Sequence, residues 1–152
     1  MSVLFKDDER FLVATKCCFF VEGKILILGE KVQDTIHWEI PGGKISKKDT
    51  EKEIISTLER EVFEELWINL SHWYKAHIFH IQKSYEKAYF SDDILPFIFI
   101  CYSIELDHFP EIRLSDEHTF YKWITLSEVD SISSWRSHFD TIVKKAFEIN
   151  PI

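Results

Sequence analysis

The segment from residue 50 to residue 66 constrains the fold most strongly, because it has the repeat of an amphipathic helix. Apolar side chains recur there at three- and four-residue spacing and would share one helix face: Ile54, Ile55, Leu58, Val62 and Leu66. Thr50 has the position of an N-cap residue, and Glu53 can reach back to it as in a capping box. The pattern predicts a helix that buries one face against a core.

Apolar runs rich in β-branched and aromatic residues predict strands on both sides of this helix. These runs cover residues 11–21, 24–28, 36–40, 73–82, 96–106 and 120–124. Glu22-Gly23 is typical of a hairpin turn, whereas Pro41-Gly42-Gly43 is expected to break regular structure. Ser127-Glu128 is expected to open a single helical turn, and a last helix is predicted over residues 135–149.

The order of these elements is strands, helix, strands, helix. It predicts an α/β (α+β) fold in which a mixed β-sheet is sandwiched between helices. The length of 152 residues fits one domain, residues 1–152, and no internal repeat or Pro/Gly/Ser-rich linker divides it.

Charge and composition argue against several classes of function. The net charge of −8 and the pI of about 5.3 argue against stable nucleic-acid binding, which needs clustered Lys and Arg. No window reaches the roughly 18 apolar residues of a membrane span, and we recognise no signal peptide. Cys17, Cys18 and Cys101 lack C-x-x-C spacing, which favours the reducing cytoplasm. The sequence leaves the oligomeric state open, with a homodimer among the alternatives.

Three glutamates lie close together on the predicted helix. At about 100° per residue, Glu61, Glu64 and Glu65 fall beside the apolar face, where their like charges repel one another. A solvated acidic face is the simplest interpretation of such a group. Arg60, Lys52 or Lys44 could also supply part of a counter-charge, but a hard cation such as Mg²⁺ or Mn²⁺ suits oxygen-only ligands better.

A glycine pair precedes this helix and favours the metal interpretation. Gly42 and Gly43 have no side chains, so their backbone could approach a polyphosphate and donate N–H groups to it. Lys44 follows directly and would lie near the phosphates. The sequence therefore indicates a site for a phosphorylated small molecule that a metal ion helps to bind.

The segment from Pro41-Gly42-Gly43 to Ile68 resembles the Nudix box, G-x5-E-x7-R-E-U-x-E-E-x-G-U, in which U is an aliphatic residue. Trp38-Glu39-Ile40-Pro41-Gly42-Gly43-Lys44 is similar to the strand that leads into the box in MutT-type members. The resemblance implies a Nudix fold over most of the chain, with Glu61, Glu64 and Glu65 as ligands of Mg²⁺ or Mn²⁺. It also implies that Arg60 is a structural partner of an acidic residue at the start of the helix.

The chain departs from the box at two places. The two ends of the motif place its first glutamate at Asp49 or at Lys52, which indicates a three-residue insertion. Asp49, Glu51 or Glu53 could take the role, and helical phase favours Glu53 as the partner of Arg60. The second departure is Trp67, where the box has the glycine of a left-handed helix end. We expect a different helix exit there, with the indole folded over the neighbouring surface.

A second motif, Glu117-His118-Thr119-Phe120-Tyr121-Lys122-Trp123, is similar to the E-H-x-x-Y-x-W stretch of diadenosine polyphosphate hydrolases and dihydroneopterin triphosphate pyrophosphatases. This resemblance implies that Glu117 faces the metal site as a ligand or base, against the alternative of a surface acid. His118 is more typical of a hydrogen-bonding fixture than of a catalyst. Tyr121 and Trp123 are expected in the core. Trp38 is a candidate to stack on a base, with core packing as the alternative.

The expected function is that of a hydrolase acting on acid anhydrides: a metal-dependent pyrophosphohydrolase of nucleoside diphosphate-linked compounds. A nucleoside triphosphate or related nucleotide is the favoured substrate, with dinucleoside polyphosphates and a pterin triphosphate as alternatives. Glu64 or Glu117 would be the general base. A second hypothesis is a nucleotide-sensing or protein-binding module that has lost turnover. An isomerase on the same fold would need an active-site cysteine, and none of the three cysteines lies in a suitable loop.

Overall fold

The computed structural model describes residues 8–49, 53–70, 75–87 and 92–150. Its strands are β1 (Leu12–Val21), β2 (Lys24–Val32), β3 (Thr35–Glu39), β4 (Gly42–Lys44), β5 (Ala76–Lys87), β6 (Ile94–Glu105) and β7 (Phe120–Ile124). Its helices are α1 (Ile54–Leu66) and α2 (Phe139–Ile149), and short 3₁₀ turns form at η2 (Lys47–Asp49) and η3 (Leu126–Ser131). The predicted order of strands, helix, strands and helix is confirmed. Neither α1 nor α2, the two α-helices in the described ranges, has the length and apolar character of a membrane span.

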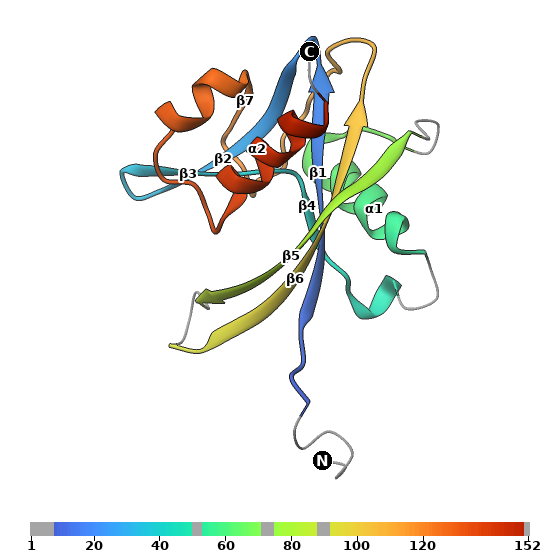
Figure 1. Cartoon of the computed structure of the whole chain (residues 1–152), viewed down its shortest axis with the longest axis vertical. Coiled ribbons are helices and arrows are strands. Elements are labelled where there is room, and N and C mark those ends of the chain that lie inside the picture. Colours follow the sequence, from blue (N-terminus) through green and yellow to red (C-terminus); the bar gives the residue numbers. More distant parts are fainter. Residues whose placement is uncertain (1–7, 50–52, 71–74, 88–91, 151–152) are drawn as a thin grey trace.

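The strands form one mixed sheet in the order β3-β2-β1-β6-β5, to which β4 adds by pairing with β1 and β7 by pairing with β2. β1 and β6 run parallel, whereas the other pairs are antiparallel. In Figure 1, α2 crosses in front of β1. The paired ends of β5 and β6 extend together to the lower left, away from α2. β5 continues beyond the predicted end at Gln82, and the expected strand residues 73 and 74 lie outside the described ranges.

Alternate side chains of β1 enter two core clusters, one on each face of the sheet. Cys18 and Phe20 pack in the cluster that contains the apolar face of α2. Cys17 and Phe19 pack in the cluster that contains Leu58, Val62 and Leu66 of α1. A strand that is buried on both faces is apolar at nearly every position, and the predicted sheet between helices is confirmed.

The start of α1 differs from the prediction. The helix begins at Ile54, and its N-cap residue, Glu53, makes no side-chain capping hydrogen bond. Thr50, the predicted cap, lies outside the described residues. Ile54 was expected in the core but is 45% exposed, because packing of the helix against the sheet starts only at Ile55.

The expected break is found at Ile40-Pro41, between β3 and β4, but it does not include the two glycines, because Gly42–Lys44 forms β4. Gly42 pairs with Lys16 and Gly43 with Thr15 of β1. Gly42 has a φ of 135°, and a Cβ there would overlap the carbonyl oxygen of Thr15. The glycine therefore allows two backbones to approach closely and extends the sheet instead of ending it.

The last helix begins at Phe139 and not at Trp135, as the sequence had predicted. Residues 134–137 instead run beside β3, where Trp38 and Trp135 form a parallel bridge. Ser134 and Ser137 have φ values of 61° and 51°, which interrupt a right-handed helix. The turn predicted at Ser127-Glu128 is confirmed as η3, which a capping box between Thr125 and Glu128 starts.

Candidate active site

α1 directs two of its three predicted metal-binding glutamates toward β4. The Glu65 side chain is buried, and its Oε1 accepts a hydrogen bond of 2.8 Å from the Gly42 amide. Glu61 lies over Gly43, where an added Cβ would overlap the Glu61 carboxylate. The two carboxylates therefore project to the same side of the helix, one turn apart.

Glu64 has a more exposed position than its two neighbours. Its side chain is 53% exposed, and its Oε2 accepts a hydrogen bond of 3.3 Å from Nη1 of Arg60. Arg60 also forms an ion pair of 3.0 Å with Glu61. Of the three predicted ligands, Glu64 is thus the one that stands at the edge of the site.

A cleft of about 400 Å³ borders these carboxylates. It is lined by Glu30, Glu39, Gly42, Glu65, Glu117, His118 and Arg136. Burial raises the pKa of Glu61, Arg60 opposes this shift, and the nearby Glu64 and Glu117 carboxylates add to it. The structure therefore brings Glu117, which precedes β7, close to the glutamates of α1.

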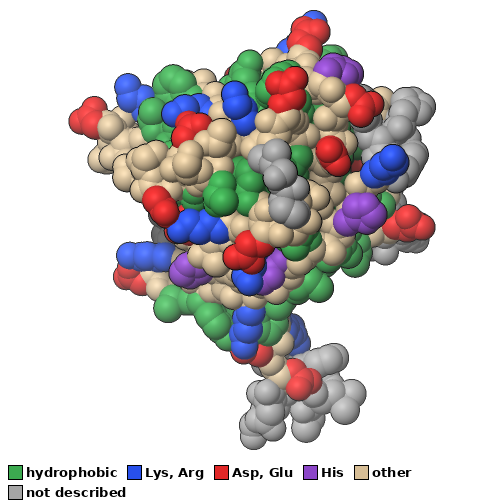
Figure 2. Space-filling view, turned by 45° about the horizontal axis from the view of Figure 1, so that its top comes forward, with side chains coloured by type: hydrophobic (Ala, Val, Ile, Leu, Met, Phe, Trp, Pro, Cys, Tyr) green, Lys and Arg blue, Asp and Glu red, His purple; other side chains and the backbone are tan. Residues whose placement is uncertain are grey.

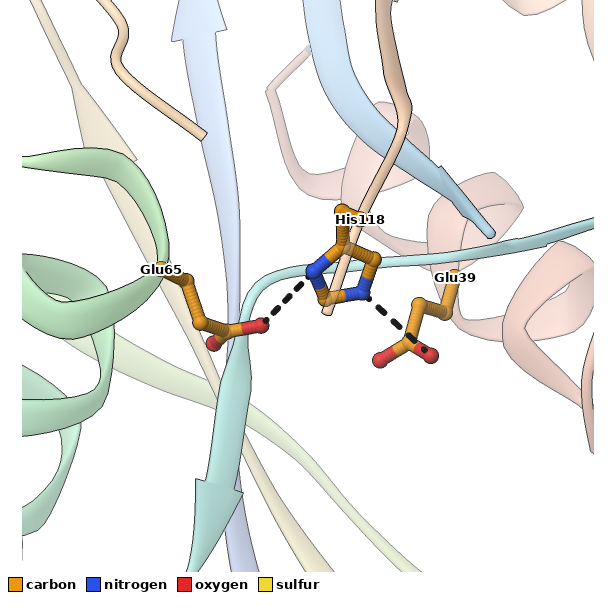
Figure 3. A group of neighbouring side chains, drawn as sticks. All are labelled: Glu39, Glu65 and His118. Carbon is orange, nitrogen blue, oxygen red and sulfur yellow. Dashed lines mark ion pairs between the residues drawn. The ribbon is translucent and has the colours of Figure 1, made fainter. Parts of the chain in front are cut away.

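His118 lies between two buried carboxylates of this cleft (Figure 3). Its Nδ1 is 3.5 Å from Oε2 of Glu65, and its Nε2 is 3.7 Å from Oε2 of Glu39. The imidazole is buried, and Nδ1 has no hydrogen-bond partner within the part of the chain that the structure describes. Burial alone would lower the pKa of His118, but the two carboxylates raise it above its ordinary value. His118 therefore links α1 and β3 through its contacts with the two carboxylates, and the hydrogen-bonding role expected from the sequence stays a prediction.

Lys16 of β1 is buried next to Glu39, which lines the cleft. Its Nζ donates hydrogen bonds to Oε1 of Glu39 at 3.1 Å and to the carbonyl oxygens of Ile40 and Gly42 at 3.3 and 3.4 Å. Burial alone would lower the pKa of Lys16, but Glu39 and Glu65 raise it. Lys16 thereby fixes the turn from β3 into β4, which presents the Gly42 amide to Glu65.

Glu39 and Glu65 have pKa values that are displaced in opposite directions. Burial raises the pKa of Glu65 to about 7, and Lys16 and the Gly42 amide oppose this shift only in part. Burial would also raise the pKa of Glu39, but Lys16, His118 and Arg136 hold it well below its ordinary value. Basic groups therefore compensate Glu39 fully and Glu65 incompletely.

Arg60 pairs with Asp49, so the preference for Glu53 is wrong. Nε and Nη2 of Arg60 lie 3.3 and 3.0 Å from the two carboxylate oxygens of Asp49. Asp49 is 4% exposed and also accepts a hydrogen bond of 2.9 Å from the Ser46 amide. η2 turns Asp49 back toward α1, whereas Glu53 stays exposed ahead of the first helical turn. Glu51 lies outside the described residues.

Trp67 ends α1 in the left-handed conformation, with φ 63° and ψ 25°. The expected change of helix exit is therefore wrong, because the tryptophan adopts the backbone conformation that suits glycine. Its ring stacks on Phe63 at 4.7 Å between centroids, and the Arg113 guanidinium carbon lies 6.0 Å from the ring centre. The indole thus folds over neighbouring surface, as expected. Among the other aromatic residues, Trp123 packs partly in the core, whereas Tyr121 is 45% exposed, so the core prediction for Tyr121 is wrong.

The predicted substrate-binding residues divide between the cleft and its surroundings. Gly42 lines the cleft, and its amide already donates to Glu65. Gly43 supports Glu61, and Lys44 is exposed and does not line the cleft. Trp38 packs partly buried against the core and lines a second cavity, of about 530 Å³. Stacking of a base on Trp38 would therefore have to involve this second cavity.

Three residues of the site were not among the sequence candidates: Lys16, Glu39 and Arg136. Lys16 is the single charged residue in the apolar run 11–21, and Glu39 immediately precedes Ile40-Pro41. A lone charge in a buried strand is a usable signal, because such a charge must find a partner. Arg136 gave no comparable signal, because its segment was assigned to a helix.

The donor set of this site fits a hard divalent cation. Glu61, Glu65 and Glu117 would offer carboxylate oxygens, and the charge of Glu65 is incompletely compensated. Carboxylates of this kind are ligands that Mg²⁺ and Mn²⁺ prefer. Glu65, Glu39 and His118 also bring potential ligand atoms within 4.8 Å of one another.

Comparisons with known proteins show the family and fold of the chain. The family model of the NUDIX domain matches residues 10–144, whereas no curated protein sequence matches the chain. Similar solved structures include a MutT protein from Methanosarcina mazei Go1, at 18% identity and a TM-score of 0.69, covering 95% of this chain and 99% of that one. An Ap4A hydrolase from C. elegans has 17% identity and a TM-score of 0.65, with coverage of 91% and 97%.

The E. coli dihydroneopterin triphosphate pyrophosphohydrolase is similar at 15% identity and a TM-score of 0.68, with coverage of 93% of this chain and 99% of that chain. Identities this low show a shared fold, whereas the family model covers most of the chain and shows the family. The chain belongs to the NUDIX family, which makes it a hydrolase of phosphorus-containing acid anhydrides, and it shares its fold with MutT-type structures.

Proposed function

We propose that the chain is a metal-dependent pyrophosphohydrolase that cleaves the phosphoanhydride of a nucleoside triphosphate or related nucleotide. The observation that carries this proposal is the position of Glu61 and Glu65. Their carboxylates lie one helical turn apart against the glycine backbone of β4, beside an acidic cleft. Such a pair repels itself unless a cation neutralises it.

Glu61 and Glu65 would hold Mg²⁺ or Mn²⁺, with Glu117 reaching in from the far side of the cleft and Glu64 from its exposed edge. A metal ion bound there would lower the pKa of the attacking water and neutralise charge on the leaving phosphate. Glu117 is better placed than Glu64 to accept the proton of that water, because it lines the cleft. Arg60 and Asp49 would keep α1 oriented toward β4.

The electrostatics of the cleft explain why the reaction would need a cation. Four of its lining residues are glutamates, which repel the phosphates of a nucleotide. Figure 2 shows acidic and basic side chains interspersed over one face of the molecule, without sorting into a patch of one sign. A cation bound inside the cleft would offset the repulsion between these glutamates and the phosphates.

The substrate panel that tests the proposal follows from the comparisons. Nucleoside triphosphates come first, and the printed names of two similar structures add Ap4A and dihydroneopterin triphosphate. Hydrolysis would be followed as release of phosphate or pyrophosphate with Mg²⁺ or Mn²⁺. We expect turnover that excess chelator abolishes.

Matched variants of α1 sharpen this test. Glu61→Gln and Glu65→Gln should each remove most activity, whereas Glu59→Gln should keep it, because Glu59 is on the same helix but does not line the cleft. Full activity in Glu65→Gln, or in the presence of chelator, would reject the proposal. If no compound is hydrolysed while a nucleotide still raises the melting temperature, the nucleotide-binding alternative replaces it.

A further inference from the structure

The segment that precedes α2 holds Arg136 in a defined backbone position. The Trp38 amide donates a hydrogen bond of 3.0 Å to the Ser134 carbonyl oxygen, and the Arg136 amide donates one of 2.8 Å to the Trp38 carbonyl oxygen. Ser134 and Ser137, on either side of Arg136, both have positive φ values. Such conformations are uncommon for residues other than glycine and concentrate at functional sites. The strained segment places Arg136 beside β3.

The Arg136 guanidinium joins two carboxylates of the cleft. Its Nη1 is 3.0 Å from Oε2 of Glu39, and its Nη2 donates a short hydrogen bond to Glu30. Within the described lining of the cleft, Arg136 is the residue with a permanent positive charge. It is therefore the protein group there that can attract an anion without help from a metal ion.

The two carboxylates depend on Arg136 to different degrees. Glu39 also accepts a hydrogen bond from Lys16 and faces His118, so its charge stays compensated when the guanidinium moves. The Glu30 side chain is 37% exposed, so water can solvate its carboxylate in place of Arg136. The pair is partly buried, with the Arg136 side chain 21% exposed, and the guanidinium keeps its contact with Glu39 when Glu30 is released. Exchanging Glu30 for another anion therefore leaves neither Glu30 nor Arg136 without a partner.

A phosphate group would be a strong replacement partner. The planar guanidinium presents its N–H groups as a fork that matches phosphate oxygens, and such charged hydrogen bonds are stronger than neutral ones. Contacts run in series across the cleft from Arg136 through Glu39 and His118 to Glu65. Arg136 therefore stands at the opposite end of this series from α1.

We propose that Arg136 binds a substrate phosphate remote from the metal-binding carboxylates, exchanging its contact with Glu30 for phosphate oxygens. The proposal rests on the proposed function and narrows its substrate class. A compound needs phosphates beyond those held at α1 to reach Arg136. Triphosphates and longer polyphosphates are therefore favoured over compounds with a single diphosphate.

Calorimetric titration with the α,β-methylene analogues of ATP and ADP, in the presence of Mg²⁺, tests this directly. Arg136→Gln should weaken binding of the triphosphate analogue about tenfold or more, the effect of losing a charged hydrogen bond. Binding of the diphosphate analogue should change by less than about twofold, since it makes no such bond. Arg136→Lys keeps the charge without the fork and should give an intermediate loss.

Two further variants separate phosphate binding from a purely structural role. Glu30→Gln removes the competing carboxylate and should strengthen binding of the triphosphate analogue. Arg113→Gln changes an exposed arginine that pairs with Glu111 outside the cleft and should leave both affinities unchanged. Melting temperatures of all variants report any loss of folding.

Equal weakening of both analogues in Arg136→Gln, no weakening at all, or weaker binding in Glu30→Gln would overturn the proposal. So would a wild-type protein that binds neither analogue. Turnover of true substrates tests the proposed function separately. If binding depends on Arg136 but no compound is turned over, only the proposed hydrolysis is rejected. If compounds are turned over but the affinity does not change in Arg136→Gln, only the phosphate contact is rejected.

Discussion

Glu39 and Glu65 are both buried in one cleft, yet their surroundings differ in charge. Glu39, at the end of β3, contacts the side chains of Lys16 and Arg136. Glu65, on α1, accepts a hydrogen bond from the Gly42 amide and faces Nδ1 of His118 at 3.5 Å. The pKa of Glu39 is accordingly depressed and that of Glu65 is raised to about 7.

This difference indicates that Glu39 is a structural anion, whereas the charge of Glu65 remains available to a cationic ligand. A buried carboxylate that basic side chains already neutralise gains little from a cation, whereas an incompletely neutralised one gains much. Because Glu61 lies on the same side of α1 as Glu65, two such groups are available together. We infer that the α1 side of the cleft binds metal and the β3 side is built for rigidity.

Glu65→Gln should have the largest effect on activity. Loss of a carboxylate that we propose to bind metal should reduce kcat/KM by about a thousandfold, comparable with removal of a strong transition-state contact. The unfolding free energy of metal-free protein should stay unchanged or rise, because a neutral amide replaces a carboxylate that is costly to bury. Steady-state kinetics and urea unfolding measure the two effects.

Glu39→Gln is the matched comparison for that variant. It should lower the unfolding free energy, because it removes one partner of Lys16, which is buried. A reversal, with Glu39→Gln stable and Glu65→Gln strongly destabilised, would break the distinction between the two carboxylates.

Lys16→Met should have the next largest effect, chiefly on stability. Removing the cation leaves a buried carboxylate with fewer partners and frees the turn into β4, which should cost about 3 kcal/mol of unfolding free energy. The double variant Lys16→Met/Glu39→Gln should recover part of this loss. Urea unfolding of the wild-type protein, both single variants and the double variant measures the coupling free energy of the pair. Additive losses would show that the pair does not interact.

Asp49→Asn should give a smaller and pH-dependent loss of stability. The Arg60 guanidinium and the Ser46 amide hold the pKa of Asp49 well below its ordinary value. The folded protein therefore binds fewer protons than the unfolded chain near pH 4, and this contribution to stability fades as pH falls through the folded pKa. Between pH 7 and pH 3, the melting temperature of Asp49→Asn should fall less steeply than that of the wild-type protein. A parallel decline in both proteins would exclude the pair as an acid-sensitive contact.

Features that depend on nearby residues could be predicted from the sequence. The three- and four-residue repeat placed Leu58, Val62 and Leu66 in the core and Glu61 and Glu65 on one side of α1. The strand at 120–124 has the predicted limits. In each case the spacing along the element determines which side chains share a face.

Features that depend on contacts between distant segments could not be predicted. Helical phase favoured Glu53 for Arg60, but this reasoning required a helix that already included Glu53, whereas α1 starts at Ile54. Asp49 reaches Arg60 through η2, a local turn that periodicity does not reveal. Likewise, the contact of Arg136 with Glu39 depends on a segment folding beside β3, and Ser134 gave no sign of its left-handed conformation.

Direct metal binding tests the central distinction most closely. Mn²⁺ would be titrated into metal-stripped protein and its free concentration followed by electron paramagnetic resonance. Wild-type protein and Glu59→Gln should bind Mn²⁺ alike, whereas Glu65→Gln should bind it at least about a hundredfold more weakly, a larger loss than supporting residues give. Equal Mn²⁺ affinity in wild-type protein and Glu65→Gln would contradict the account.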